Sequence, residues 1–183
     1  MEESREKDKK KKEVNELTTF TVPYDYEKTK ENNLISNNST NSHSKEQLIN
    51  QAFKLHSQGN ILEAEKCYKY CISQGFDDAR VFSNYGVILY DLGKLKEAKI
   101  IQRKAIEIKP DFAEAHSNLG SILRDLGKIE EAEISTRKAI KLKPDFAQAH
   151  YNLGNMLKDL GKLKEAELSQ RQAIKIKPDF DQA

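Results

Sequence analysis

Apolar residues recur at every third or fourth position from about residue 45 onward. That spacing puts them on one side of an α-helix and predicts amphipathic helices rather than strands. Segment 113–146 shows the pattern twice, before and after Gly127, and therefore predicts two helices joined by a tight turn. The first helix presents Ala115, Leu119, Ile122, Leu123 and Leu126, and the second presents Ile129, Ala132, Thr136, Ala139, Ile140 and Leu142.

The ends of this helix pair carry their own signals. Gly127 follows the first helix, where a residue in the left-handed conformation commonly ends a helix. Pro144 stops the second helix. Asp145 is expected to cap the next helix, with Gln148 as the acceptor three residues on. Gly120 leaves room for the two helices to approach closely.

The helix pair is one unit of an internal repeat with a period of 34 residues. Segments 113–146 and 147–180 agree at 23 of 34 positions without gaps. The same interval separates three of the four prolines and four glycines, namely Pro110, Pro144, Pro178, Gly59, Gly93, Gly127 and Gly161. The array, residues 45–183, divides into units 45–78, 79–112, 113–146 and 147–180, with a fifth starting at residue 181.

These units resemble the tetratricopeptide repeat in period and motif. The resemblance rests on Asn118-Leu-Gly120, Gly127, Ala132, Ala139 and Pro144, and it covers residues 45–183. It implies an all-α fold, a right-handed α-solenoid of four helix-turn-helix repeats whose first helices line a concave groove. It also implies a protein–protein interaction scaffold that binds an extended peptide or partner segment in that groove.

An asparagine occupies the same place in all four first helices: Asn50, Asn84, Asn118 and Asn152. Together with the segments Ala-His-Ser-Asn-Leu-Gly and Lys-Pro-Asp-Phe, the series resembles the superhelical arm of O-linked N-acetylglucosamine transferases. The resemblance implies that such asparagines bind the backbone of an extended peptide. A primary amide both donates and accepts, so it can pair with a peptide unit of any sequence. The alternative is that these amides cap or bridge neighbouring helices.

Further groove candidates follow from the same period. One series holds Ser83, Ser117 and Tyr151, and another holds Tyr90, Asp91, Arg124, Asp125, Lys158 and Asp159. The charges alternate in sign, so the groove implies no ligand of a single charge. The alternative interpretation is an ordinary solvated face.

Residues 1–44 differ in character from the array. They hold nine hydrophobic residues, about 20%, against about 42% in residues 45–183. A mixed-charge run followed by a polar, low-complexity stretch cannot bury enough surface to order itself, so a disordered arm is predicted. Its single apolar and aromatic cluster is Phe20-Thr-Val-Pro-Tyr-Asp-Tyr26. That cluster either docks on the array, docks on a partner or is solvated.

Composition narrows the function classes. The formal net charge is only +2, from 31 basic and 29 acidic residues, which argues against nucleic acid as a partner. Two cysteines are too few for a disulfide-stapled secreted scaffold. No apolar run is long enough to span a membrane, and the first 30 residues hold no signal-peptide core. We therefore expect a cytoplasmic protein without membrane contact.

No catalytic or cofactor-binding motif appears in the sequence. Cys67 and Cys71 lie one turn apart and could supply half a zinc site, but alanine fills the place of Cys71 in the other units. Core packing is therefore the expectation for Cys71. His116 and His150 lie one unit apart, roughly 10 Å, which is too far for one metal ion. We expect no enzyme activity, metal or cofactor.

The sequence stops three residues into a fifth unit without a polar capping helix. Apolar residues of the last unit, among them Leu163, Leu168, Ile174 and Ile176, would then face a successor. One expectation is self-association through this uncapped repeat. Another follows from resemblance to long cyanobacterial tetratricopeptide proteins: the chain would be the N-terminal, substrate-recruiting arm of a larger glycosyltransferase-like protein.

Overall fold

The computed structural model describes residues 45–178, and every regular element in that range is an α-helix. The helices are α2 (Lys45–Ser57), α3 (Ile61–Ser73), α4 (Ala79–Asp91), α5 (Leu95–Ile108), α6 (Ala113–Asp125), α7 (Ile129–Leu142), α8 (Ala147–Asp159) and α9 (Leu163–Ile176). The expected disordered arm and the expected start of a fifth unit at residue 181 lie outside the described residues.

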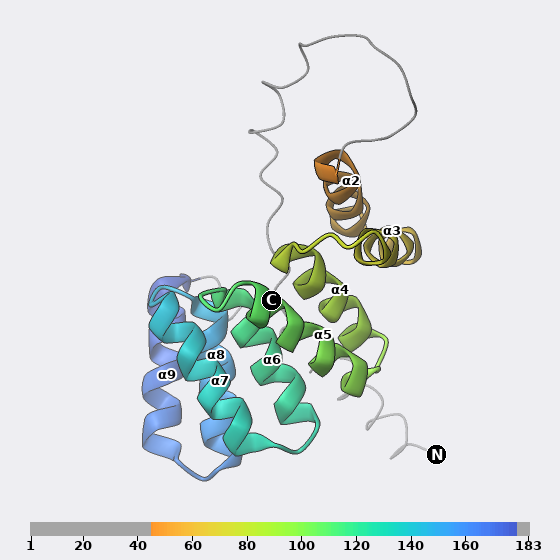
Figure 1. The fold of residues 1–183 in the computed structure, drawn as a ribbon. Helices are drawn as coiled ribbons and strands as arrows, with labels where there is room; N and C mark the ends of the chain where they lie inside the picture. Colours follow the sequence, from red (N-terminus) through yellow and green to blue (C-terminus); the bar gives the residue numbers. More distant parts are fainter. Residues whose placement is uncertain (1–44, 179–183) are drawn as a thin grey trace, which may run out of the picture.

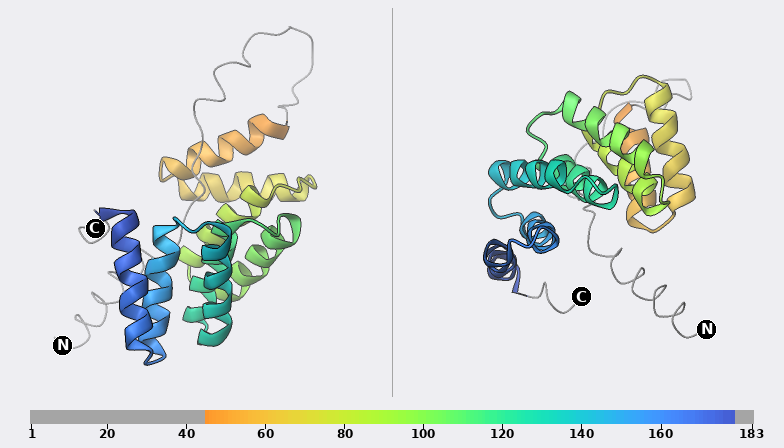
Figure 2. Two further views of the ribbon diagram at one scale, coloured as in Figure 1. Left: turned by 90° about the vertical axis from the view of Figure 1, so that its left-hand side faces the viewer. Right: turned by 90° about the horizontal axis from the view of Figure 1, so that it is seen from below.

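The helices of the described range form four pairs that stack in chain order (Figure 1). The two helices of a pair pack against each other, and the second helix packs against the first helix of the next pair. Adjacent first helices also touch, α4 against α6 and α6 against α8. Figure 2 follows the pairs from α2 to α9 as their orientation changes along the stack. The expected all-α solenoid of four helix-turn-helix repeats is confirmed.

A glycine in the left-handed region ends the first helix of every pair. The φ angles are 76° at Gly59, 73° at Gly93, 74° at Gly127 and 73° at Gly161. At Gly127 the turn is closed by two backbone hydrogen bonds, from Gly127 N to Arg124 O (2.9 Å) and from Lys128 N to Leu123 O (2.8 Å). This arrangement satisfies carbonyls at the helix end and requires a positive φ. The prediction for Gly127 is confirmed.

The start of the first helices differs from the sequence prediction. Asp145 does not cap α8; the N-cap is Phe146, whose side chain makes no capping hydrogen bond. Its carbonyl accepts the first helical bond, from His150 N at 3.2 Å. The Phe146 ring is 4% exposed and packs with Ala113, Ala139 and Ala149. Burial of the ring therefore sets the start of the helix, one residue later than a polar cap would.

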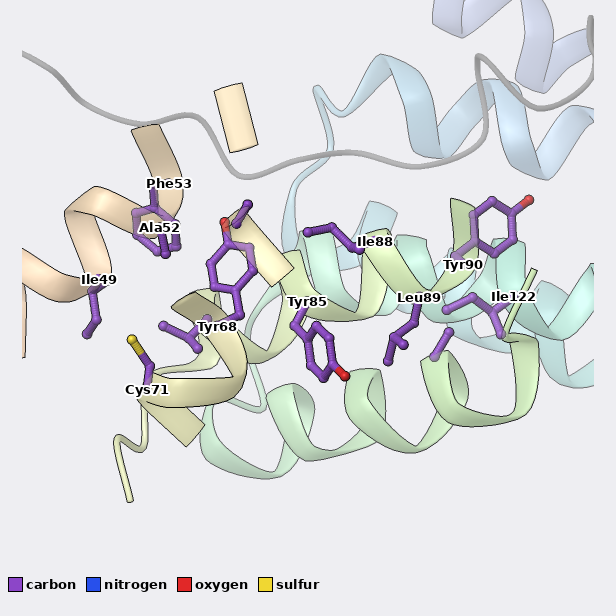
Figure 3. Close-up of a cluster of buried hydrophobic side chains, with 13 residues drawn as sticks. Ile49, Ala52, Phe53, Tyr68, Cys71, Tyr85, Ile88, Leu89, Tyr90 and Ile122 are labelled. Carbon is purple, nitrogen blue, oxygen red and sulfur yellow. The ribbon is translucent and has the colours of Figure 1, made fainter. Parts of the chain in front are cut away.

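A cluster of buried side chains joins the first repeat to the second (Figure 3). It holds Ile49 and Phe53 of α2, Tyr68 and Cys71 of α3, and five residues of α4. Cys71 is 0% exposed, as are Ala105, Ala139 and Ala173 at the same place in the other units. Its expected role in core packing is confirmed, and the same burial raises the pKa of its thiol.

Candidate interaction surface

The asparagine series lies between neighbouring first helices. Asn84, Asn118 and Asn152 are 2%, 0% and 2% exposed, whereas Asn50 of α2 is half-buried. A buried amide needs hydrogen-bond partners, because an unsatisfied polar group in the core is costly. The protein supplies those partners from the preceding repeat.

Two of these amides bridge adjacent first helices. Asn118 Nδ2 of α6 donates to Ser83 Oγ of α4 at 3.4 Å. Asn152 Nδ2 of α8 donates to Ser121 Oγ of α6 at 3.0 Å, and its Oδ1 accepts from Gln148 Nε2 at 2.9 Å. These contacts match the alternative in which the amides bridge helices. Their role in binding a peptide stays a prediction.

Ser117 stands apart from the other hydroxyls of the first helices. It is 1% exposed, and its Oγ has no hydrogen-bond partner among the described residues. Ser117 lies one repeat after Ser83, which accepts from Asn118. The equivalent donor for Ser117 is Asn152, which bonds to Ser121 instead. The Asn152 amide therefore bonds to the Ser121 hydroxyl of α6, and the Ser117 hydroxyl is left without a partner among the described residues.

Asn84 bonds to the first repeat through the phenol of Tyr68. The same phenol lies 3.2 Å from His56 Nδ1. Tyr68 is fully buried, and its burial raises the pKa of the phenol. Burial likewise lowers the pKa of His56. Both groups therefore stay neutral near pH 7 and form a polar link between α2, α3 and α4.

A second set of predicted residues forms a row across the ends of three first helices, which we call the inner polar row: Tyr90, Asp91, Arg124, Asp125, Lys158 and Asp159. Each repeat bonds to the next through it. The Tyr90 hydroxyl donates to Asp125 Oδ2 at 2.5 Å, and Arg124 Nε donates to Asp159 Oδ2 at 2.9 Å. The structure thus brings these residues together in a single register.

The two ends of the inner polar row have no partner of this kind. Asp91 on α4 and Lys158 on α8 are exposed and form no ion pair with another described residue. Asp91 is the last residue of its helix, where the dipole disfavours a negative charge. Partial burial of its carboxyl group raises the pKa to about 6. The row therefore presents an unpaired acid at one end and an unpaired base at the other.

Two features of the surface were missed by sequence reasoning. A pocket of about 380 Å³ lies between α7, α8 and α9, lined by Arg137, Ile140, Lys141, His150, Leu153, Leu168, Ser169 and Gln172. Leu168 of this lining belongs to a series with Ile100 and Ile134, which are exposed at intervals of 34 residues. The period alone could have revealed this series, because an apolar residue recurs where polar residues would be expected on an outer face.

The last repeat carries the residues expected to face a successor. Ile174 of α9 is 42% exposed, whereas Ile106 and Ile140 at the same place in earlier repeats are half-buried. Each of those two packs against residues of the following repeat. Self-association through this face stays a prediction.

His116 and His150 contact backbone rather than each other. Nε2 of His116 donates to the carbonyl oxygen of Pro110 at 3.0 Å, and Nε2 of His150 donates to that of Pro144 at 2.9 Å. Within residues 45–178, no group of three or more His, Cys, Asp or Glu side chains is placed to hold a metal ion. In the same range, no helix is long and apolar enough to cross a membrane.

Solved structures with this fold come from several proteins. The crystal structure of MamA is 19% identical, with a TM-score of 0.66, and the match covers 76% of this chain and 82% of that chain. YrrB, described as a TPR protein with an unusual peptide-binding site, is 22% identical with a TM-score of 0.63, covering 74% and 70%. A mutant O-GlcNAc transferase from Thermobaculum terrenum is 26% identical with a TM-score of 0.59, covering 62% of this chain but 22% of that one. No curated protein matches the sequence.

Family models identify the repeat directly. A tetratricopeptide repeat model matches residues 79–112 and 147–180, and a second tetratricopeptide model matches residues 102–134. A further TPR repeat model matches residues 120–161. Together the matches span residues 79–180, more than half of the chain. The chain belongs to the tetratricopeptide repeat family.

Proposed function

We propose that the chain is a protein-interaction scaffold that binds an extended segment of a partner along the inner polar row. The partner segment would present a basic group to Asp91 and an acidic group to Lys158. Neighbouring helices pack about 10 Å apart, so these two residues lie roughly 20 Å apart on α4 and α8. An extended peptide covers that distance in about six residues.

The observation that supports this proposal is the unpaired charge at each end of a row whose interior is paired. Asp125 and Asp159 already accept from Tyr90 and Arg124. A partner that competes for those groups must break existing bonds, whereas Asp91 and Lys158 are available at no such cost. Asp91 and Lys158 are therefore the residues that distinguish one peptide from another. Because one is acidic and the other basic, they favour a single direction of the bound peptide.

In this proposal the buried asparagines hold the first helices in register. Asn118 and Asn152 keep α4, α6 and α8 at a fixed spacing through their bonds to Ser83 and Ser121. A fixed spacing between the row's ends is what allows selection of a peptide by the separation of its charges. Replacing these asparagines with alanine should have a larger effect on the stability of the protein than on its selectivity for peptides.

The test uses the full chain and labelled ten-residue peptides followed by fluorescence anisotropy. One peptide carries Arg and Glu six positions apart, a second carries them in reverse order, and a third carries Gln at both positions. We expect one order to bind most tightly, by roughly two- to five-fold per charge, the range for exposed ion pairs. The paired change Asp91→Lys with Lys158→Glu should exchange the preference between the first two peptides.

Two controls sharpen this experiment. The paired change Glu130→Lys with Lys164→Glu alters exposed charges on α7 and α9 and should leave the preference unchanged. Because the pKa of Asp91 is about 6, binding of the preferred peptide should weaken as the pH falls from 7 to 5. Equal binding of the neutral peptide, or an unaltered preference after the charge exchange, would refute the proposal.

A second candidate is the recruiting arm of a larger transferase. The observation in its favour is the 26% identity to part of the O-GlcNAc transferase, which this chain matches over 22% of that protein's length. The gene beyond codon 183 decides between the candidates. A reading frame that continues into a transferase domain supports the arm, and a stop codon rejects it.

A further inference from the structure

Three exposed apolar side chains form a series that the proposed function does not use. Ile100, Ile134 and Leu168 are 63%, 71% and 68% exposed and occupy the same place on α5, α7 and α9. We call them the apolar ladder. Single exposed hydrophobic residues are ordinary on a protein surface, so the regular alignment of these three is the feature that calls for an explanation.

The three helices that carry the ladder belong to successive repeats and are linked by ion pairs. Arg103 of α5 pairs with Glu131 of α7 at 3.5 Å, and Arg137 of α7 pairs with Glu165 of α9 at 3.0 Å. These helices are not among the pairs that pack directly on each other, so the ladder from Ile100 to Leu168 spans more than the roughly 20 Å expected for three helices in contact. At the Leu168 end it opens into the pocket of about 380 Å³, where Ile140 and Leu153 add apolar surface.

The chain contains a segment whose pattern fits this surface. In Phe20-Thr-Val-Pro-Tyr-Asp-Tyr26 the apolar and aromatic residues alternate with Thr21, Pro23 and Asp25. Bound in an extended conformation, the segment would turn Phe20, Val22, Tyr24 and Tyr26 to one side. Six steps of about 3.3 Å separate the Cα atoms of Phe20 and Tyr26 by roughly 20 Å, and the outermost aromatic side chains extend that side further along the ladder.

The connection to the array is long enough for this contact. Residues 27–44 separate the segment from the start of α2 at Lys45. Eighteen residues reach as far as about 60 Å when extended, and the ladder begins on α5, in the repeat that follows the repeat of α2. The inner polar row offers no comparable apolar surface, and no other three exposed large hydrophobic residues within residues 45–178 lie 34 residues apart, so the regular apolar pattern of the segment favours the ladder.

We propose that residues 20–26 bind across the apolar ladder of their own chain and cover Ile100, Ile134 and Leu168. Bound there, the segment places one aromatic ring in the pocket beside Leu168 and shields the outer side of α5, α7 and α9. The contact lies on the second helices and, at the pocket, on His150 and Leu153 of α8, and it involves none of the residues of the inner polar row.

Limited proteolysis of the full chain tests this contact. Chymotrypsin cleaves after Phe20, Tyr24 and Tyr26, and mass spectrometry follows cleavage at these sites alone. Cleavage tracks the fraction of molecules with the segment released, so nine-tenths docking slows it about ten-fold. The triple variant Ile100→Ser, Ile134→Ser, Leu168→Ser should lose that protection, with cleavage rising by about the same factor.

Matched variants and a second readout keep the test decisive. Lys96→Ser, Glu130→Ser and Lys164→Ser change exposed residues one turn away on the same helices and should preserve protection. Methyl NMR of the full chain should show the three ladder residues shifting when Phe20, Val22, Tyr24 and Tyr26 become serine. The alternate change, Thr21→Ala with Asp25→Ala, should leave those signals in place.

Three outcomes would overturn the proposal. One is equal cleavage in the wild-type protein and the ladder variant. Another is that the methyl chemical shifts of the ladder residues stay the same after the serine changes at residues 20–26. The third is protection that disappears on dilution, because a contact within one chain is independent of concentration whereas an exchange between two copies is not.

Discussion

At the scale of single residues, two glycines of one helix pair show different physical constraints. A Cβ atom at Gly120 would collide with the side chain of Thr136 and lie 3.3 Å from the carbonyl oxygen of Ala132. A Cβ atom at Gly127 would meet nothing within 4 Å, but the φ of 74° strains any other residue. One glycine is required by packing and the other by backbone conformation.

We therefore expect Gly120→Ala to destabilise the protein by about 1–3 kcal/mol through overpacking. Gly127→Ala should cost about 1–2 kcal/mol through backbone strain. Urea unfolding measures both. Adding Thr136→Ala should recover part of the loss in Gly120→Ala and none of the loss in Gly127→Ala. Absence of that selective rescue would contradict the packing explanation.

The residue scale also shows what a sequence can and cannot reveal. Gly127 was predictable because its role depends on four or five neighbouring residues. The burial of Asn118 was not, because it depends on how closely α4 approaches α6. A helical pattern predicts which side of α6 carries the Asn118 amide, but how deeply that amide is buried depends on the neighbouring repeat.

At the scale of a helix, α4 begins differently from α6 and α8. Asp78 is its N-cap, and one carboxylate oxygen accepts from Arg80 N at 2.8 Å. The equivalent positions hold Phe112 and Phe146, which make no capping hydrogen bond. Arg80 also lies 3.7 Å from Glu46 and over the ring of Phe53, so the start of α4 holds α2 in place.

The cap of α4 gives a prediction with a definite pH dependence. Burial alone would raise the pKa of Asp78, but the hydrogen bonds and charge of Arg80 outweigh it and hold that pKa below its usual range. Its contribution is therefore present above the ordinary value of about 3.9 and is lost as the pH falls through the lower folded value. Asp78→Ala should cost about 1 kcal/mol at pH 7, and the difference from wild type should shrink below pH 4.

Thermal unfolding at several pH values measures this effect. The neighbouring Asp77 is exposed and provides the control, since Asp77→Ala should change stability by less than about 0.5 kcal/mol. A difference between Asp78→Ala and wild type that stays constant from pH 7 to pH 3 would show that the carboxylate charge plays no part.

Helix starts also explain why one sequence prediction was wrong. Asp145 has the residue type and spacing of a cap, yet Phe146 takes the position because its ring enters the core. Lys143 Nζ lies 5.0 Å from the centre of that ring and covers its outer side. Tertiary packing of the Phe146 ring, rather than local capping by Asp145, determines where α8 begins. The sequence around Asp145 does not show this packing, because it depends on residues of the preceding repeat.

At the scale of the whole molecule, the repeats do not contribute equally. α4, α6 and α8 contact one another in series, while α2 has no comparable contact with α4. The first repeat is joined to the stack through α3, Arg80 and the cluster around Tyr68. In an array of this kind, stability is the sum of unit and neighbour terms, so a unit with fewer neighbour contacts opens more easily.

Hydrogen exchange should therefore show a gradient along the chain. We expect amides of α4 to α7 to be the most protected, because both of their repeats have a neighbour on each side. Amides of α2 and α3 should exchange faster under the same conditions. Mass spectrometry with peptide resolution measures the rates, and uniform protection from α2 to α9 would contradict a stack of separable units.

The fold as a whole was predictable and the surfaces were not. A period of 34 residues determines the number of helix pairs, the turns and the fully buried slot shared by Cys71 and Ala139. The pocket beside Leu168 arises between three helices of two repeats. Its volume depends on their spacing, which no single repeat encodes.

The inner polar row and its neighbours have a consequence for how such proteins change over time. Equivalent contacts between repeats keep one separation: Tyr90 with Asp125 and Arg124 with Asp159 are 35 residues apart, and Arg103 with Glu131 and Arg137 with Glu165 are 28 residues apart. Loss of residues 113–146 would recreate the junction between a phenylalanine and an alanine and would bring Tyr90 opposite Asp159 and Arg103 opposite Glu165. The unit of evolutionary change here is the whole repeat: a gene can delete or duplicate one and still pair Tyr90 with an aspartate and Arg103 with a glutamate of the next repeat.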